Sequence, residues 1–217
     1  MSAGVIFDCD GVLVDSEPLS AAAMAETMRS AGIDASAEDA AREFTGLSLE
    51  SAMARSEEML GAPLPADFAP SYRSRLYAAF DAELEAVSGV AAAIATIESR
   101  GIPTCVASSG EHERIRRALS LAGLHAGFEG RIYSATEVEH GKPAPDLFLH
   151  AARSEGWEPG LCVVVEDSTA GAAAGRAAGM SVLGYAERTP AEALAAEGAE
   201  PFASMHDLPG LVAARIV

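Results

Sequence analysis

The chain has no apolar run long enough to cross a bilayer, and its first residues lack the basic stretch and cleavage site of a secretory leader. We therefore expect a soluble, cytoplasmic protein. Cysteine is also scarce: Cys9, Cys105 and Cys162 lie within or beside short apolar runs, without any Cys-x-x-Cys or Cys/His pair. The sequence thus predicts buried free thiols and argues against a metal site built from them.

Basic residues are few, with 15 Lys and Arg against 32 Asp and Glu and a formal net charge of -17. Because nucleic-acid phosphates are bound by clustered Lys and Arg, we do not expect nucleic acid as a partner. An acidic surface that aids solubility explains the charge without any function. An acidic protein that binds a phosphate ester must neutralise it locally, with a metal ion, a lysine or backbone amides.

The pattern of apolar runs predicts an α/β protein. With 217 residues, 49% of them hydrophobic, the chain can bury one good core and carry a modest inserted module. From Thr104 onward, short strand-like runs alternate with helix-like segments, which is typical of a parallel sheet covered on both faces. The expected strands are 5–7, 104–107, 131–133, 162–165 and 181–184, and the expected helices between them are 111–122, 145–155 and 169–178.

Residues 19–85 have a different pattern. They form successive helical stretches rich in Ala, Met, Leu and Glu, with breaks near Gly32, near Gly46 and at 61–65, and with no convincing strand between them. We interpret this region as an all-helical insertion that follows the first strand directly.

Two acids follow that first strand, in the run Asp-Cys-Asp-Gly from Asp8 to Gly11. Because side chains alternate along a strand, Asp8 and Asp10 are expected on the same side. The carboxyl ends of parallel strands are where ligands bind in open sheets, and Gly11 would allow a sharp turn that brings backbone amides near an anion. The alternative is a strand end whose acids merely face water.

Two further segments carry groups suited to a phosphate. Ser108, Ser109 and Gly110 follow the second core strand and lead into a helix, so that a hydroxyl and amides of the helix N-terminus can meet a phosphate oxygen. Simple helix capping is the alternative for Ser109. Lys142 lies in a loop stiffened by two prolines after the third strand. A lone loop lysine is usually just solvated, but this one is the obvious candidate to offset phosphate charge.

A fourth segment places Glu166 and Asp167 at the end of an unbroken run of valines, the pattern of a buried central strand. Adjacent acids in such a position are unfavourable unless positive charge lies between them. Magnesium prefers carboxylate and carbonyl oxygens, so the sequence predicts Mg²⁺ as a cofactor here.

These four motifs, in this order at the ends of successive strands, closely resemble the haloacid dehalogenase superfamily of phosphohydrolases. The run from Phe7 to Glu17 and the Glu-Asp-Ser sequence at 166–168 are similar to its sugar phosphatase and beta-phosphoglucomutase branch. The resemblance implies a Rossmann-like parallel-sheet core, residues 1–14 and 87–217. It also implies a small all-helical cap domain, residues 15–86, inserted after the first strand. Because this segment is inserted between the first strand and the rest of the sheet, we expect it to close over the core as a lid.

The resemblance also implies the chemistry of each motif. Asp8 would attack phosphorus and carry an aspartyl-phosphate, while Asp10 would protonate the leaving alcohol and then activate the hydrolytic water. Ser108 or Ser109, with Gly110, and Lys142 would hold the transferring phosphoryl group. Phosphoryl transfer needs mainly in-line positioning and charge stabilisation, and this set of residues supplies both.

By the same resemblance, magnesium would bind the Asp8 carboxylate, the Asp10 main-chain carbonyl and Asp167. Glu166 fits an outer partner that orients a metal-bound water or Lys142 better than a direct ligand, although the sequence leaves both roles open.

Competing functions remain open within this family. Asp10 argues against a true dehalogenase, which has no leaving alcohol to protonate. A phosphosugar mutase of the beta-phosphoglucomutase type uses a histidine in the first cap helix and an arginine in the next cap loop, whereas Ser20 and the loop 46–50 provide neither. Hydrolysis is therefore favoured over the mutase reaction and over a catalytically silent binding module of the same fold.

The expected substrate is a small phosphate ester, most simply a sugar phosphate. Specificity in this architecture should come from the cap loops, where Leu47, Ser48 and Glu50 are the candidate contacts. Ordinary helix capping, with Ser48 as the cap, is the alternative for these residues. The oligomeric state is not readable from the sequence.

Overall fold

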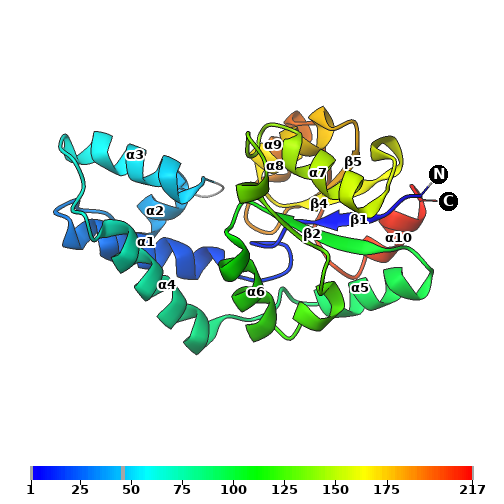
Figure 1. Cartoon of the computed structure of the whole chain (residues 1–217), viewed down its shortest axis with the longest axis horizontal. Helices are drawn as coiled ribbons and strands as arrows, with labels where there is room; N and C mark the ends of the chain where they lie inside the picture. Colours follow the sequence, from blue (N-terminus) through cyan, green and yellow to red (C-terminus); the bar gives the residue numbers. More distant parts are fainter. Residues whose placement is uncertain (1, 45–46, 217) are drawn as a thin grey trace. The chain divides into compact units, whose positions relative to one another are not determined.

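The structure is a computed structural model that describes residues 2–44 and 47–216. The chain divides into two compact units, residues 1–14 together with 86–217, and residues 15–85. Among the described residues, the strands lie in the first unit and the second unit is built from helices (Figure 1).

The first unit contains a parallel sheet of six strands in the order β3-β2-β1-β4-β5-β6. Its strands are β1 (Val5–Phe7), β2 (Thr104–Ser108), β3 (Ile132–Ser134), β4 (Val163–Glu166), β5 (Ser181–Tyr185) and β6 (Glu200–Phe202). β1 is central and pairs with both β2 and β4, so that Phe7 lies opposite Val106 on one side and Val165 on the other. The predicted α/β class with a parallel sheet is confirmed.

Helices cover both faces of this sheet. They are α5 (Val90–Ser99), α6 (His112–Leu121), α7 (Asp146–Glu155), α8 (Thr169–Ala177), α9 (Ala191–Ala196) and α10 (Leu208–Ala213). Figure 1 shows α7, α8 and α9 on one side of the sheet and α5 with α10 on the other. Of these elements, β6, α5, α9 and α10 were not among the segments expected from the sequence.

The core of this unit follows the alternation of side chains along β1. Ile6 packs in a buried cluster with Val164 of β4 and Phe148 of α7. Phe7 points to the opposite face, where its ring meets the ring of Phe128 edge to face with centroids 6.3 Å apart. A strand buried on both faces needs the continuous apolar sequence that this one has.

The second unit consists of α1 (Glu17–Ser30), α2 (Ala37–Phe44), α3 (Leu49–Leu60) and α4 (Phe68–Glu83). Its own hydrophobic cluster includes Met24 and Met28 of α1, Phe44 of α2 and Phe68 of α4. Small apolar side chains on α1 allow α2 and α4 to pack against that helix.

The two chain crossings between the units run side by side. Asp15 N donates to Glu85 O (3.0 Å), and Val87 N donates to Leu13 O (3.0 Å). Val14 and Ala86 form an antiparallel bridge at the same place. The loop that carries Asp8 and Asp10 is therefore tied directly to the segment by which the chain returns from the helical unit.

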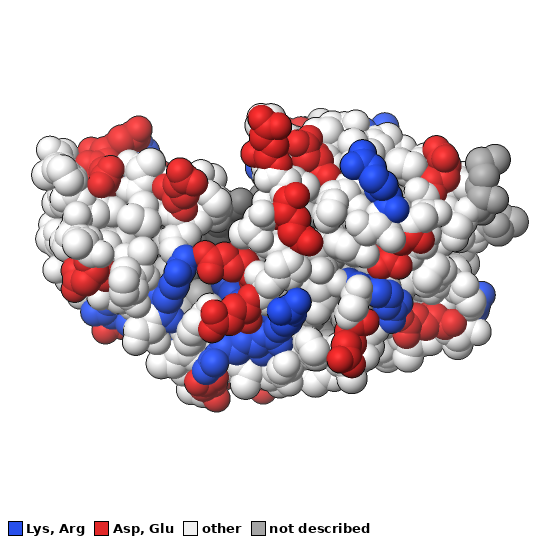
Figure 2. Space-filling view, in the orientation of Figure 1, with Lys and Arg blue, Asp and Glu red and all other residues white. Residues whose placement is uncertain are grey.

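The surface agrees with the acidic composition, since Asp and Glu side chains are spread over the face drawn in Figure 2. Within the described residues, no helix has both the length and the apolar character that a bilayer crossing requires.

Candidate active site

The motif residues gather at the carboxyl edge of the sheet. β1 ends at Phe7 immediately before Asp8, β2 ends at Ser108, and β4 ends at Glu166. Because neighbouring parallel strands end at the same edge, residues far apart in sequence come together there. The strand ends before Asp8, so the alternation from which we expected Asp8 and Asp10 on one side does not extend to Asp10. That residue lies in a turn in which Gly11 N donates to Val14 O.

A buried lysine joins two of the predicted acids. The Lys142 ammonium lies 2.5 Å from Asp8 Oδ1 and 2.6 Å from Glu166 Oε1. Its side chain is only 4% exposed, and Nζ also donates to Ala107 O and lies over the ring of Phe148. The loop lysine is therefore not a solvated surface residue; it is part of the site.

Burial and charge act against one another in this group. Burial raises the pKa of Asp8 to about 7, opposed by the positive charge of Lys142 and reinforced by the negative charges of Glu166 and Asp10. Burial would lower the pKa of Lys142, but the charges of Asp8 and Glu166 together raise it above its usual value. The lysine thus remains charged, and a further cation beside Asp8 would favour the ionised form of its carboxylate.

Glu166 is held by backbone as well as by the lysine. Its Oε2 accepts hydrogen bonds from Asp167 N, Ser168 N and Ser168 Oγ, each 2.9 Å long. Ser168 also caps α8 by accepting from Gly171 N. With both carboxylate oxygens engaged, Glu166 is arranged to orient Lys142.

Asp10 has a partner that the sequence reading missed. The Arg114 guanidinium donates to both of its oxygens, Nη1 to Oδ2 at 2.7 Å and Nη2 to Oδ1 at 2.8 Å. Arg114 lies in the first turn of α6, 104 positions further along the chain. The sequence does not distinguish Arg114 as the partner of Asp10, because Arg116 and Arg117 follow in the same helix.

Asp167 lies against the turn that carries Asp10. A Cβ added to Gly11 would be 2.0 Å from Asp167 Oδ2, and Gly11 has a φ of +74°. Only glycine tolerates both the left-handed backbone and this close carboxylate. The turn after Asp10 and the acid after β4 therefore form one continuous part of the site.

The second motif supplies a rigid loop. Ser108 is buried, and its Oγ accepts from Gly110 N at 3.2 Å. The Gly110 carbonyl in turn accepts from Ser134 Oγ at the end of β3. Glu111 occupies the N-cap position of α6, so Ser109 does not cap this helix, which was the alternative expectation for its hydroxyl.

Only some of the predicted metal ligands are placed where they could bind magnesium. In the ranges 2–44 and 47–216, no three Asp, Glu, His or Cys side chains form a group that could hold a metal ion. The Asp10 carboxylate is bound by Arg114, and that of Glu166 is held by Lys142 and the β4–α8 turn. The other two acids of the site are Asp8, which also bonds Lys142, and Asp167, which lies against the turn at Gly11. Magnesium binds through one or two carboxylates and completes its shell with water and substrate phosphate, so these hard oxygens fit it.

The residues of the helical unit that were expected to contact substrate lie around the start of α3. Leu47 is 46% exposed, and Ser48 and Glu50 are also exposed. Ser48 is the N-cap of α3 and accepts from Ser51 N, which is the capping role considered as the alternative. Ser20 lies in α1, and Gly46 falls outside the described residues.

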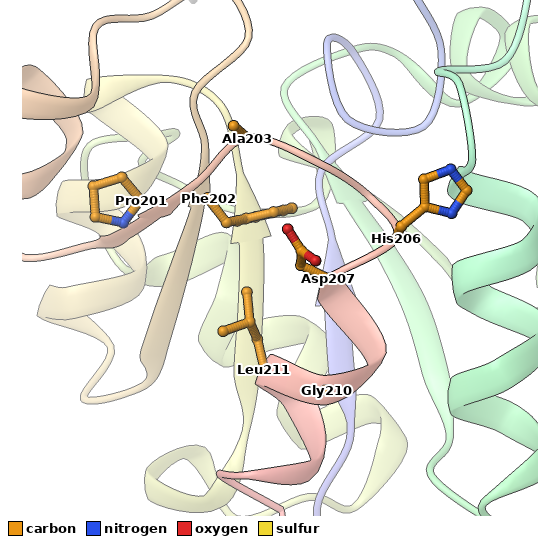
Figure 3. Close-up of a pocket in the computed structure, with 7 residues that line it drawn as sticks. All are labelled: Pro201, Phe202, Ala203, His206, Asp207, Gly210 and Leu211. Carbon is orange, nitrogen blue, oxygen red and sulfur yellow. The ribbon is translucent and has the colours of Figure 1, made fainter.

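A groove between β6 and α10 is a separate feature of the first unit (Figure 3). It includes none of the motif residues. Phe202 and Leu211 give it apolar walls, and the Asp207 carboxylate lies on its rim. The residues that line the groove include one carboxylate and no Lys or Arg, whereas the strand-end site holds Lys142 and Arg114 beside its acids, so the strand-end site is the better candidate for a phosphate.

Comparisons with known proteins agree with this geometry. Residues 3–179 match the family model of haloacid dehalogenase-like hydrolases. The chain is 30% identical over 212 residues to 6-phosphogluconate phosphatase of Escherichia coli (strain K12), covering 97% of this chain and 95% of that protein. It is 33% identical over 183 residues to hexitol phosphatase A of the same strain, covering 83% and 81%.

Among solved structures, a conserved haloacid dehalogenase-like protein of unknown function from Agrobacterium tumefaciens str. C58 has 34% sequence identity and a TM-score of 0.83. The match covers 99% of each chain. With a family model that spans most of the sequence and relatives that share its full length, the chain belongs to the haloacid dehalogenase-like hydrolase family and is an enzyme related to phosphatases.

Proposed function

We propose that the protein is a magnesium-dependent phosphatase that hydrolyses a small phosphate monoester through an aspartyl-phosphate on Asp8. The observation that carries the proposal is the buried Lys142 ammonium, bonded to both Asp8 and Glu166 at the carboxyl edge of the sheet. A cation in this position can neutralise a phosphoryl group that approaches Asp8, and it holds the nucleophile in place.

In the first half of the reaction, an Asp8 carboxylate oxygen attacks phosphorus, and the bond from phosphorus to the substrate oxygen breaks. Asp10 gives its proton to that oxygen, which leaves as an alcohol. In the second half, Asp10 takes a proton from water while the water oxygen attacks phosphorus. Inorganic phosphate departs, and the Asp8 carboxylate is restored.

The negative charge of the transferring phosphoryl group must also be neutralised. Lys142 and the hydroxyl of Ser108 or Ser109 would bind the phosphoryl oxygens, with the amide of Gly110 nearby. Asp8, Asp167 and the Asp10 main-chain carbonyl would hold Mg²⁺, which supplies charge stabilisation of the phosphoryl group when bound. Glu166 keeps Lys142 directed at Asp8.

We propose a sugar phosphate or polyol phosphate as the substrate class. Two relatives that cover most of the chain are named for 6-phosphogluconate and for hexitol. We further propose that residues 15–85 close over the core as a lid and exclude bulk water, with Leu47, Ser48 and Glu50 toward the substrate. The absence of His and Arg from position 20 and from 47–50 supports hydrolysis over a mutase reaction.

The test is turnover of a panel of phosphorylated metabolites and p-nitrophenyl phosphate by the wild-type enzyme and by Asp8→Asn and Asp10→Asn. Asp8→Asn should have no activity on any ester. Asp10→Asn should lose about 10² to 10⁴ in rate on alkyl esters and retain a trace on the activated aryl ester. The exposed Asp207→Asn is a matched control that should keep wild-type rates. Equal, mild losses at Asp8 and Asp10 would refute these roles, and a wild-type protein without turnover would favour the silent binding module.

A further inference from the structure

The Arg114 guanidinium donates two parallel hydrogen bonds, of 2.7 and 2.8 Å, to the Asp10 carboxylate. Such a bidentate pair fixes the plane of the carboxylate, which a single ammonium contact does not. Both side chains are partly enclosed, with 23% of Arg114 and 24% of Asp10 exposed. The pair is therefore shielded more than an ordinary surface ion pair, whose contribution is small.

The position of Arg114 is unfavourable for its own helix. It lies in the first turn of α6, where the helix dipole disfavours positive charge. The negative charge of the Asp10 carboxylate offsets this unfavourable interaction with the helix dipole. The loop before α6 also leaves space for the guanidinium. A Cβ at Gly110 would lie 3.0 Å from Arg114 Nη1, so the glycine at this position gives the guanidinium room. Helix stability alone does not explain an arginine here.

Asp10 needs such support, because the sheet does not hold it. β1 ends at Phe7, and Asp10 lies in the turn that follows. Its side chain can rotate about two bonds, whereas a group that exchanges a proton must stay in hydrogen-bond reach of the reacting oxygen. A misplacement of about 1 Å in such a group can reduce a rate by about 10².

We propose that Arg114 is a positioning residue of the reaction, which orients the Asp10 carboxylate toward the oxygen of the leaving group. This inference rests on the proposed function, in which Asp10 exchanges that proton. Arg114 itself transfers nothing. The effect of this positioning should be exerted through Asp10 and should grow with the need of the leaving group for a proton.

The experiment compares kcat/KM of wild type, Arg114→Gln, Asp10→Asn and the double variant on three esters. p-Nitrophenyl phosphate has an activated leaving group, glycerol 3-phosphate has a poor and uncharged one, and 6-phosphogluconate adds a carboxylate. kcat/KM is used because it reports the steps up to departure of the leaving group. Arg116→Gln, an exposed change in the same helix, is the matched control.

For Arg114→Gln we expect a loss on the order of 10- to 100-fold on both alkyl esters and less than about threefold on the aryl ester. In the Asp10→Asn background the same change should have little further effect, because the partner is already altered. Arg114→Lys keeps the charge but not the fork, so it should recover only part of the loss.

Two results would overturn the proposal. A loss confined to 6-phosphogluconate would mean that Arg114 binds the substrate carboxylate directly. Equal losses on all three esters, additive with Asp10→Asn, would mean a general structural role. Thermal unfolding of each variant checks folding, and Arg114→Lys provides a second folded variant if Arg114→Gln is unstable. The proposed function fails separately, if Asp8→Asn remains active.

Discussion

Gly171 lies in the first turn of α8, directly against the carboxylate that holds Lys142. A Cβ at this position would be 1.7 Å from Glu166 Oε1 and 1.9 Å from Cδ. Glu166 is 1% exposed and cannot move into solvent without leaving its partners. Gly171→Ala should therefore push the Glu166 carboxylate away from the lysine, although alanine is the better helix former.

Two opposing terms set the size of the effect. Replacing glycine by alanine within a helix stabilises by about 1 kcal/mol. Each hydrogen bond to a charged group contributes about 1.5–3 kcal/mol, and displacement strains the bonds of Glu166 to Lys142, Asp167 N and Ser168. With one or two of these bonds lost, we expect a net decrease of about 1 to 3 kcal/mol in the free energy of unfolding.

Thermal denaturation measures this decrease. For a chain of this size, about 1 kcal/mol shifts the midpoint by roughly 2–4 °C, so Gly171→Ala should lower it by about 3–10 °C. Gly210→Ala is the matched control, because Gly210 is also helical and an added Cβ meets nothing within 4 Å. It should be neutral or slightly stabilising. Turnover by Gly171→Ala should fall at least about tenfold through misplacement of Lys142. An unchanged midpoint with full activity would refute the reasoning.

Three further outcomes follow from the described contacts. Excess chelator should stop turnover and added Mg²⁺ should restore it, because the acids around Asp8 need a second cation; full activity in chelator would contradict the metal assignment. A thiol reagent should label none of the three cysteines before unfolding and all three afterwards, since Cys9, Cys105 and Cys162 are each 1% exposed or less. Small phosphates should be hydrolysed in preference to phosphopeptides if residues 15–85 act as a lid, and a phosphopeptide as the best substrate would contradict this.

The meeting of Asp8, Lys142 and Glu166 could be anticipated from the sequence. Asp8 and Glu166 each directly follow a short apolar run, and parallel strands bring such ends to one edge. Lys142 and Asp8 are 134 positions apart in the sequence. The predicted topology and the charge of a phosphate ligand were nevertheless enough to place them in one site. The resemblance to a known family then suggested their roles, which the experiments above test.

The Asp10–Arg114 pair could not be anticipated. Arg114, Arg116 and Arg117 lie close together in α6, and which of them faces Asp10 depends on where the helix begins and how the loop after Ser108 turns. Those details arise from tertiary contacts such as the bond from Ser134 Oγ to the Gly110 carbonyl. A sequence pattern carries no such information.

Strand β6, at one side of the sheet, could not be predicted for a different reason. β6 is a three-residue strand, Glu-Pro-Phe, with a charge and a proline in place of the usual β-branched residues. Proline is tolerated in a sheet mainly at an edge, because it cannot donate to a ladder. Pairing with β5 makes these residues a strand, and no local propensity indicates it.

The charges at the carboxyl edge of the sheet explain why both a lysine and a metal ion suit this site. Asp8, Asp10, Glu166 and Asp167 are four acids in one place. Lys142 bonds Asp8 and Glu166, and Arg114 bonds Asp10, so these two side chains bring two positive charges to the four acids. A bound phosphate dianion adds two more negative charges in a largely buried place, where unpaired charge is unfavourable. The remaining compensation must come from a cation that accepts oxygen ligands, and we propose Asp8 and Asp167 as the carboxylates that would hold it. Because the whole chain is strongly acidic, long-range attraction from the protein does not replace this local charge.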